Sequence, residues 1–121
     1  MSSAAVAALR GRTVPKGEAL SAARIAGVQG AKRTSDLIPL AHPIGVHAIE
    51  VDLVVVDDGV DPSATVRTFD RTGVGMEALT VVAVGVLALI DMVKAVDRHA
   101  RITDVRVIAK SGGGSGYGME S

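Results

Sequence analysis

The chain contains no cysteine and no tryptophan, and aromatic residues make up only 2% of its 121 residues. The lack of cysteine excludes disulfides, thiolate metal sites and a cysteine nucleophile, and it favours a reducing, cytoplasmic compartment. With so few aromatic residues, the core has to be built from Ala, Val, Leu and Ile. A chain of this length is expected to form one domain, which we place at residues 1–121.

Neither sign of charge is in excess, because 13 Lys and Arg stand against 13 Asp and Glu. Proteins that bind nucleic acid usually carry a basic excess or a basic stripe, so this balance argues against a nucleic-acid partner. Residues Met1–Val6 lack the basic start and the apolar stretch of a signal peptide. The longest apolar run, Val81–Ile90, has about half the length that a membrane span needs. The composition predicts a soluble cytoplasmic protein.

The first half of the chain contains a helix signal and a hairpin signal. Small residues over Ala19–Arg33 predict a helix, in which Gly27 and Gly30 would allow a very close approach of another backbone. The alternation of apolar and polar residues over Val46–Val56 predicts a strand. A turn then leads to a second expected strand, Ala64–Asp70, which completes a hairpin.

The second half contains the longest expected helix, which runs from Met76 to about Val96 and is apolar nearly all round. Such a helix should be buried on most sides, and in so small a chain we expect part of that burial to come from another subunit. A last strand is expected over Ile102–Ile108, before a glycine-rich tail. Residues 1–14 fit either a frayed helix or an ordered arm. The order helix, hairpin, helix, strand predicts an α+β fold with helices packed on one face of a mainly antiparallel sheet.

Several polar residues could carry chemistry, and each also has a structural interpretation. Lys16 lies on a turn between Pro15 and Gly17. It could serve as a proton donor or a phosphate partner, or it could be an ordinary solvated lysine. His42 lies in an apolar loop and titrates near neutrality, although a lone loop histidine is more often structural. Glu77 and Asp91 are two heptads apart, which predicts one shared helix face.

Asp91 and Lys94 are three positions apart and therefore neighbours on a helix. They could form an exposed salt bridge, or they could act as a functional pair. Apolar neighbours would desolvate Lys94 and favour the neutral amine that a general base requires. Taken alone, the candidate residues predict only an enzyme that binds an anion.

A resemblance to a known family narrows this prediction. Its sequence blocks occur here in the family's order: Lys16–Glu18, Ala22–Gly27, Ala31–Thr34, Asp36–Pro43, Thr72–Thr80, Asp91–Ala95 and Lys110–Gly113. From about Pro15 to Gly116 the chain resembles the MoaC family, the cyclic pyranopterin monophosphate synthases of molybdenum-cofactor biosynthesis. The resemblance implies a ferredoxin-like α+β subunit and a homo-oligomer in which dimers assemble into a hexamer. It also implies active sites at a subunit interface, and neither a metal nor an organic cofactor.

The implied activity is that of a lyase. It converts a 3′,8-cyclised dihydro-GTP, a small-molecule substrate, into cyclic pyranopterin monophosphate and releases pyrophosphate. The family's site residues carry over as catalytic Lys16, Asp91 and Lys94, and as substrate-binding His42, Met76, Glu77 and Lys110. We expect Lys16 and Lys94 to transfer protons and stabilise charge, Asp91 to orient Lys94, and His42 to contact the leaving group.

The chain departs from the family pattern at four places. Gly75 replaces the first glutamate of Gly-Val-Glu-Met-Glu-Ala, Gly114 replaces a lysine, and Ala41 stands where a cysteine is usual. The family's usual N-terminal stretch does not precede Lys16. The alternative function is therefore a catalytically weak paralogue that binds nucleotide or assembles with an active relative.

The spacing on the long helix bears on how a site could be built. Glu77 and Asp91 are fourteen positions apart, which is about 21 Å at 1.5 Å per residue. Either an elongated triphosphate spans them, or the two helix ends serve different sites across an interface. We expect the second arrangement, with Lys16 and Lys94 reaching one site from different chains.

Overall fold

The computed structural model describes residues 1–41, 45–68, 75–110 and 117–120; for residue 47 and for residues 107–110 and 117–120 it describes the backbone. The elements follow in the order α1 (Ser3–Gly11), α2 (Ala19–Lys32), α3 (Thr34–Leu37), β1 (Val46–Val56), β2 (Gly59–Thr68), α4 (Gly75–Val93), β3 (Arg106–Lys110) and β4 (Tyr117–Glu120).

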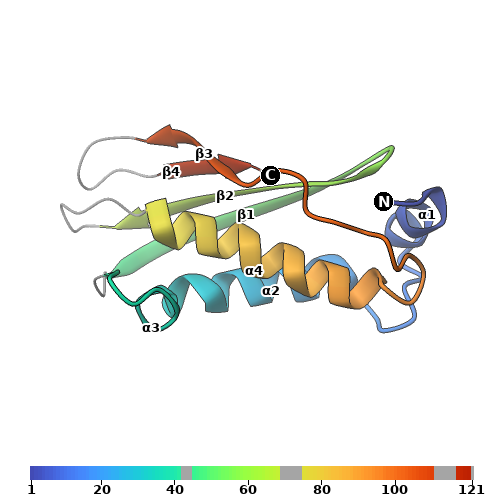
Figure 1. Ribbon diagram of the computed structural model, residues 1–121, viewed down its shortest axis with the longest axis horizontal. Helices are drawn as coiled ribbons and strands as arrows, with labels where there is room; N and C mark the ends of the chain where they lie inside the picture. The colour runs from blue at the N-terminus through green and yellow to red at the C-terminus, as the bar shows by residue number, and fades with distance from the viewer. Residues whose placement is uncertain (42–44, 69–74, 111–116, 121) are drawn as a thin grey trace.

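The strands form one sheet in the order β1-β2-β4-β3, and each neighbouring pair is antiparallel. Figure 1 shows α2 and α4 lying side by side on one face of this sheet, with α1 beyond the hairpin tip. This arrangement confirms the predicted α+β fold with its helices on one face. It also places the end of α4 close to the α1–α2 connection.

The contact between α2 and α4 depends on small residues, as the sequence predicts. A Cβ atom added at Gly27 would lie 2.8 Å from the carbonyl oxygen of Val81, and one at Gly30 would lie 2.9 Å from Cγ2 of Val84. Both separations are shorter than real Cβ contacts, so neighbouring atoms of α4 would have to shift. Close packing therefore explains why α2 retains two glycines that weaken it as an isolated helix.

The hairpin is longer than predicted. β2 begins at Gly59 and includes Pro62, whereas the sequence predicted a turn up to this proline and a strand only from Ala64. In an antiparallel hairpin, residue pairs that exchange hydrogen bonds alternate with pairs that do not, starting from the pair that closes the turn. Leu53↔Pro62 is a pair without hydrogen bonds, so proline is tolerated here. The missing N–H of Pro62 would have pointed away from β1.

Helix α4 is long and apolar enough to cross a membrane by length and composition, with a mean hydropathy of 2.1. Half of its apolar window is buried inside the subunit, where it packs against α2 and the sheet. This burial is typical of the core helix of a soluble protein. Its outer surface nevertheless exposes Met76 at 42% and Leu87 at 58%.

Helix α4 ends at Val93, three residues earlier than predicted, because Val96 and Asp97 both donate their N–H to the Val93 carbonyl and close a turn. The Asp97 carboxylate then accepts from the backbone N–H of Ser2 at 2.7 Å and of His99 at 2.9 Å. These bonds, the first above all, lower the pKa of Asp97. They fix the start of α1 against the end of α4.

The last part of the sheet differs from the prediction in two respects. β3 begins at Arg106 rather than Ile102, and β4 was not predicted at all. β4 lies between β2 and β3, so the end of the chain enters the middle of the sheet.

Candidate active site

The turn that carries Lys16 is fixed at both ends. The N–H of Gly17 donates to the Val14 carbonyl at 3.0 Å, which places Pro15 and Lys16 at the two central positions of the turn. Pro15 restricts its own φ, and Gly17 takes the φ of +121° that a residue with a side chain rarely adopts. Val14 is buried and packs in the same cluster as Leu89 and Val93 of α4, together with Leu9, Ala19 and Ala23. The turn is therefore held against the end of α4.

Asp91 in the last turn of α4 and Lys94 directly after the helix lie on the side opposite these buried residues. Leu89 and Val93 point into the core at 2% and 0% exposure. Asp91 and Lys94 lie on the outer side, and their side chains are 55% and 57% exposed. The same helical periodicity that buries the apolar residues thus brings the two polar ones to the surface beside the turn.

One carboxylate joins the two lysines. Lys94 Nζ lies 2.7 Å from Asp91 Oδ1, and Lys16 Nζ lies 3.3 Å from Asp91 Oδ2 and 3.4 Å from Oδ1. The hydrogen bond from Lys94, followed by that from Lys16, lowers the pKa of Asp91. Two lysines and one carboxylate give the cluster a formal net charge of +1, which favours an anionic ligand. The two lysine amines, both bonded to one carboxylate, are groups that can transfer protons.

Two expectations about this cluster are wrong. Lys94 is not desolvated by its apolar neighbours, because those neighbours point inward and more than half of its side chain is exposed. Lys16 and Lys94 do not need two chains to meet, because both contact Asp91 within one subunit. The turn at Lys16 and the last turn of α4 form a single local cluster.

Met76 and Glu77 lie at the opposite end of α4. Met76 is 42% exposed, whereas Glu77 is 4% exposed, and burial raises the pKa of Glu77. Glu77 and Asp91 lie in different environments, because Glu77 is buried and Asp91 is exposed. Along a straight helix two heptads separate them by only about 40° around the axis, so they stay on one side of α4 and differ in what covers each end of the helix.

The remaining predicted site residues stay untested. His42 lies outside the described residues, as does Gly114. Lys110 ends β3, where its backbone pairs with Tyr117, and only its backbone is described. Within the described ranges, no three His, Asp or Glu residues converge in a way that could hold a metal ion.

Sequence reasoning missed one residue that builds the site. Val14 anchors the Lys16 turn on α4, and its signal was available as an apolar residue directly before a proline. Gly75, in contrast, is placed as the sequence suggested, at the first position of α4 and two residues before Glu77.

Comparison with known proteins gives matches along most of the chain. The MoaC family profile matches residues 1–113. A cyclic pyranopterin monophosphate synthase of Streptomyces griseus is 68% identical over 108 residues, which cover 89% of this chain and 61% of the relative. The relative of that name from Nocardioides sp. is 55% identical, over 96% of this chain and 73% of its own length.

A protein named cyclic pyranopterin monophosphate synthase 2, from Mycobacterium bovis, is 54% identical over 85% of this chain and 62% of its own length. The chain thus spans about three fifths of the length of the Streptomyces griseus and Mycobacterium bovis relatives. Because the family profile covers nearly the whole chain, the chain belongs to the MoaC family.

Proposed function

We propose that this protein is a cyclic pyranopterin monophosphate synthase, a lyase that acts on the 3′,8-cyclised dihydro-GTP and releases pyrophosphate. The observation that carries this proposal is the convergence of Lys16, Asp91 and Lys94 within one subunit. The substrate is polyanionic, and a cluster with a net charge of +1 at the surface attracts it. The names of the relatives support the same reaction.

In this proposal each member of the cluster has a separate role. Lys16 and Lys94 transfer protons and stabilise developing negative charge, and Asp91 holds Lys94 at 2.7 Å in the orientation that the transfer needs. His42 and Lys110 contact the phosphate groups, and Met76 and Glu77 bind the substrate from the other end of α4. The reaction takes place in the cytoplasm and uses neither a metal nor an organic cofactor.

The site is completed by a second copy of the chain. Along one straight helix, Glu77 is about 21 Å from Asp91, which is too far for one bicyclic head group to touch both. Between the two ends, the outer surface of α4 exposes Leu87 at 58%. An antiparallel partner helix on this surface would bring Glu77 of the partner subunit towards Lys94. We propose a homo-oligomer of such dimers, assembled as a hexamer.

Gly75 favours a second function, that of a weak paralogue. It occupies the first position of α4 beside Glu77, where a glutamate in the family would add another carboxylate. The alternative protein would bind nucleotide, or assemble with an active relative, with little turnover of its own.

The decisive experiment supplies purified protein with the cyclised GTP intermediate and measures the pterin formed, with binding measured separately. Loss of a general acid or base should lower turnover by about 10² to 10⁴ in Lys94→Gln, with a much smaller effect on binding. Arg10→Gln is the charge-matched control, because Arg10 pairs with Asp57 on the surface near the hairpin. Turnover of Lys94→Gln near that of the parent contradicts the assigned role. Binding without turnover in the parent supports the paralogue.

A further inference from the structure

One buried carboxylate lies beside the proposed active site without being part of it. Asp97 is 9% exposed and comes three residues after Lys94. Its Oδ2 atom accepts from the Ser2 N–H at 2.7 Å, and its Oδ1 atom accepts from the His99 N–H at 2.9 Å. Each carboxylate oxygen therefore has a backbone donor of its own, and the bond to Ser2 joins residues that are 95 positions apart.

Helix α4 holds the backbone of both Lys94 and Asp97. The N–H of Lys94 donates to the Ile90 carbonyl at 2.9 Å, and the N–H of Asp97 donates to the Val93 carbonyl at 2.9 Å. Lys94 therefore keeps its place without the Asp97 carboxylate. The same bonds make Asp97 a fixed point at the end of α4, to which a second segment is attached.

This second segment begins at Ser2 and ends at Lys16. Ser2 is the N-cap of α1, where its hydroxyl accepts from the N–H of Ala5 at 3.2 Å. At the far end of α1 the N–H of Thr13 donates to the Ala8 carbonyl at 2.9 Å, and the turn that carries Lys16 follows directly. α1 has nine residues and is therefore about 13 Å long. Over that length, the position of its start determines where the turn lies.

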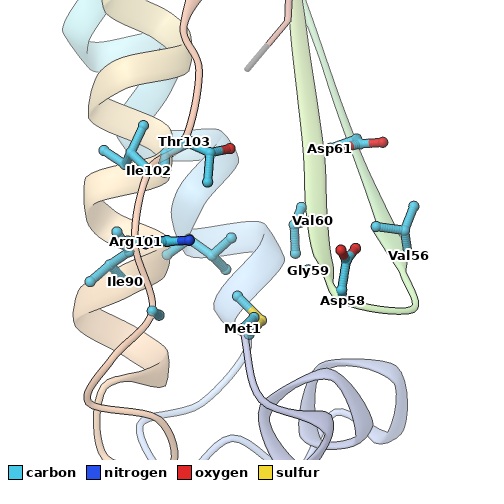
Figure 2. A pocket seen from close by; sticks show the side chains of 13 residues that line it. Met1, Val56, Asp58, Gly59, Val60, Asp61, Ile90, Arg101, Ile102 and Thr103 are labelled. Carbon is cyan, nitrogen blue, oxygen red and sulfur yellow. The ribbon is translucent and has the colours of Figure 1, made fainter.

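Close packing holds the start of α1 on one side only. Met1 packs against the apolar core, but it also borders a cavity of about 330 Å³ between the tip of the β1–β2 hairpin and the segment that leads from α4 to β3. Figure 2 shows Met1 at the end of this cavity, between the hairpin tip and the segment that carries Ile102. Because packing is open on that side, the bond from the Ser2 N–H to Asp97 has to fix the start of α1.

The ion pair of Lys16 with Asp91 is too exposed to fix Lys16 by itself. Its shortest N–O distance is 3.3 Å, and the two side chains are 45% and 55% exposed. Exposed pairs of this kind contribute little, because water screens the charges and ordering two side chains costs entropy. The position of Lys16 therefore depends on the backbone that carries it.

We propose that Asp97 is a positioning residue, which places Lys16 beside Asp91 by fixing the start of α1 through the Ser2 N–H. Loss of the Asp97 carboxylate displaces Lys16 and leaves Lys94 in place. The effect of this displacement on catalysis rests on the proposed function, whereas the displacement itself does not.

The first test follows the titration of the Asp91 carboxyl carbon by NMR in Asp97→Ala, with Lys16→Gln as the reference. The hydrogen bonds from Lys94 and then from Lys16 lower the pKa of Asp91, so loss of the Lys16 contact should raise the midpoint in both variants. Removal of a nearby negative charge would by itself lower the pKa of a carboxyl, so a rise in Asp97→Ala is not a direct charge effect. The double variant should rise no further than Lys16→Gln alone.

Two substitutions at Ser2 isolate the bond to Asp97. Ser2→Ala removes the hydroxyl that caps α1 and keeps the backbone N–H, whereas Ser2→Pro removes both. Proline fits this position, because Ser2 has a φ of −69°. Ser2→Pro should therefore raise the Asp91 midpoint more than Ser2→Ala does. Asp57→Ala is the control and should leave the midpoint unchanged, because Asp57 also contacts α1, through Arg10, but with a fully exposed side chain.

Three results of the titration would overturn the proposal. In the first, neither Asp97→Ala nor Ser2→Pro raises the Asp91 midpoint, or Ser2→Pro raises it no more than Ser2→Ala. In the second, the double variant rises above Lys16→Gln, which would show that Asp97 acts by another route. In the third, Lys16→Gln itself has no effect, which would show that Lys16 does not contact Asp91 in solution. If Asp97→Ala does not fold, the two Ser2 variants decide.

The second test measures turnover of the cyclised GTP intermediate. Asp97→Ala should lower kcat by about 10- to 100-fold, because a misplacement of about 1 Å can cost about 10²-fold. KM should change less, because the charge of Lys16 stays near the site. An unchanged kcat together with a raised Asp91 midpoint would overturn the role of Asp97 in the reaction. A parent protein without turnover contradicts the proposed function instead, and the titration then decides whether Asp97 positions Lys16.

Discussion

The ammonium of Lys16 donates to both carboxylate oxygens of Asp91, 75 positions later in the chain, at 3.4 and 3.3 Å. The same carboxylate accepts from Lys94, the residue directly after the end of α4, at 2.7 Å. A turn near the start of the chain and the last turn of α4 therefore share one anionic group. Any change at Asp91 alters the position of both amines.

The titration of Asp91 should report this sharing. Because the hydrogen bond from Lys94 contributes most to lowering the pKa of Asp91, Lys94→Gln should move the titration midpoint towards the ordinary carboxyl value, and Lys16→Gln should move it less. The stabilisation is complete above the unfolded pKa and is lost as pH falls through the lowered folded pKa. NMR titration of the Asp91 carboxyl carbon measures both midpoints. An unchanged midpoint in Lys94→Gln would show that the pair does not persist in solution.

Glu77 should give the opposite pH dependence. Burial raises the pKa of Glu77, so the folded state favours its protonated form. Its favourable contribution is complete below the unfolded pKa and is lost as pH rises through the raised folded pKa. Glu77→Gln should therefore unfold at higher urea than the parent near neutral pH, with a difference that shrinks towards pH 4. A second subunit that supplies a cation to Glu77 would reverse the effect at neutral pH.

Two glycine substitutions should separate close packing from helix propensity. At Gly27 an added methyl meets the Val81 carbonyl oxygen at 2.8 Å, and such overpacking costs about 1–3 kcal/mol. At Gly11, near the end of α1, the nearest atom is 3.7 Å away, so alanine should be neutral or stabilise by up to about 1 kcal/mol. Urea denaturation measures both free energies of unfolding. A Gly27→Ala protein as stable as the parent would contradict the close α2–α4 contact.

The sequence predicted the elements whose signals are local. Helix α2, strand β1 and most of α4 were found because apolar periodicity and small residues recur within each segment. The sequence does not reveal the start of β2 because Pro62 predicts a turn, and only the register with β1 shows that a backbone N–H is not needed at this position. β4 could not be found from a short Gly-containing segment, because its place in the sheet depends on two distant strands.

The candidate site was predictable to a similar extent. The spacing of Asp91 and Lys94 predicted that the two side chains pair, and the turn at Pro15 predicted a fixed position for Lys16. Their meeting depends on Val14 packing against α4, which is a tertiary contact that no local pattern contains. The predicted desolvation of Lys94 was wrong because residues next to one another in the sequence of a helix point in different directions.

Restoring a glutamate at the entrance of α4 should raise activity if the rest of the site is intact. Gly75 is the first residue of α4, where a carboxylate gains about 0.3–1 kcal/mol from the helix dipole. Gly75→Glu should therefore increase both the free energy of unfolding and the rate of pterin formation. Gly75→Gln is the control, because it has a side chain of the same length without the charge. If both variants fold but neither gains turnover, the position is dispensable here.

The proposed two-chain site makes a quantitative prediction for mixed subunits. Lys94→Ala and Glu77→Ala proteins are each inactive alone, and they are mixed in equal amounts under conditions where subunits exchange. If every site takes Lys94 from one chain and Glu77 from its partner, about a quarter of the sites in a random mixture are intact. Turnover should then recover to about a quarter of the parent value.

Lys16→Ala mixed with Lys94→Ala is the internal control. These residues contact Asp91 in one chain, so every site lacks one of them and no activity should return. Rescue in the control would show that Lys16 and Lys94 of one site come from different chains. No rescue in the first mixture, despite exchange shown by mass spectrometry, would contradict a site that takes Lys94 from one chain and Glu77 from its partner.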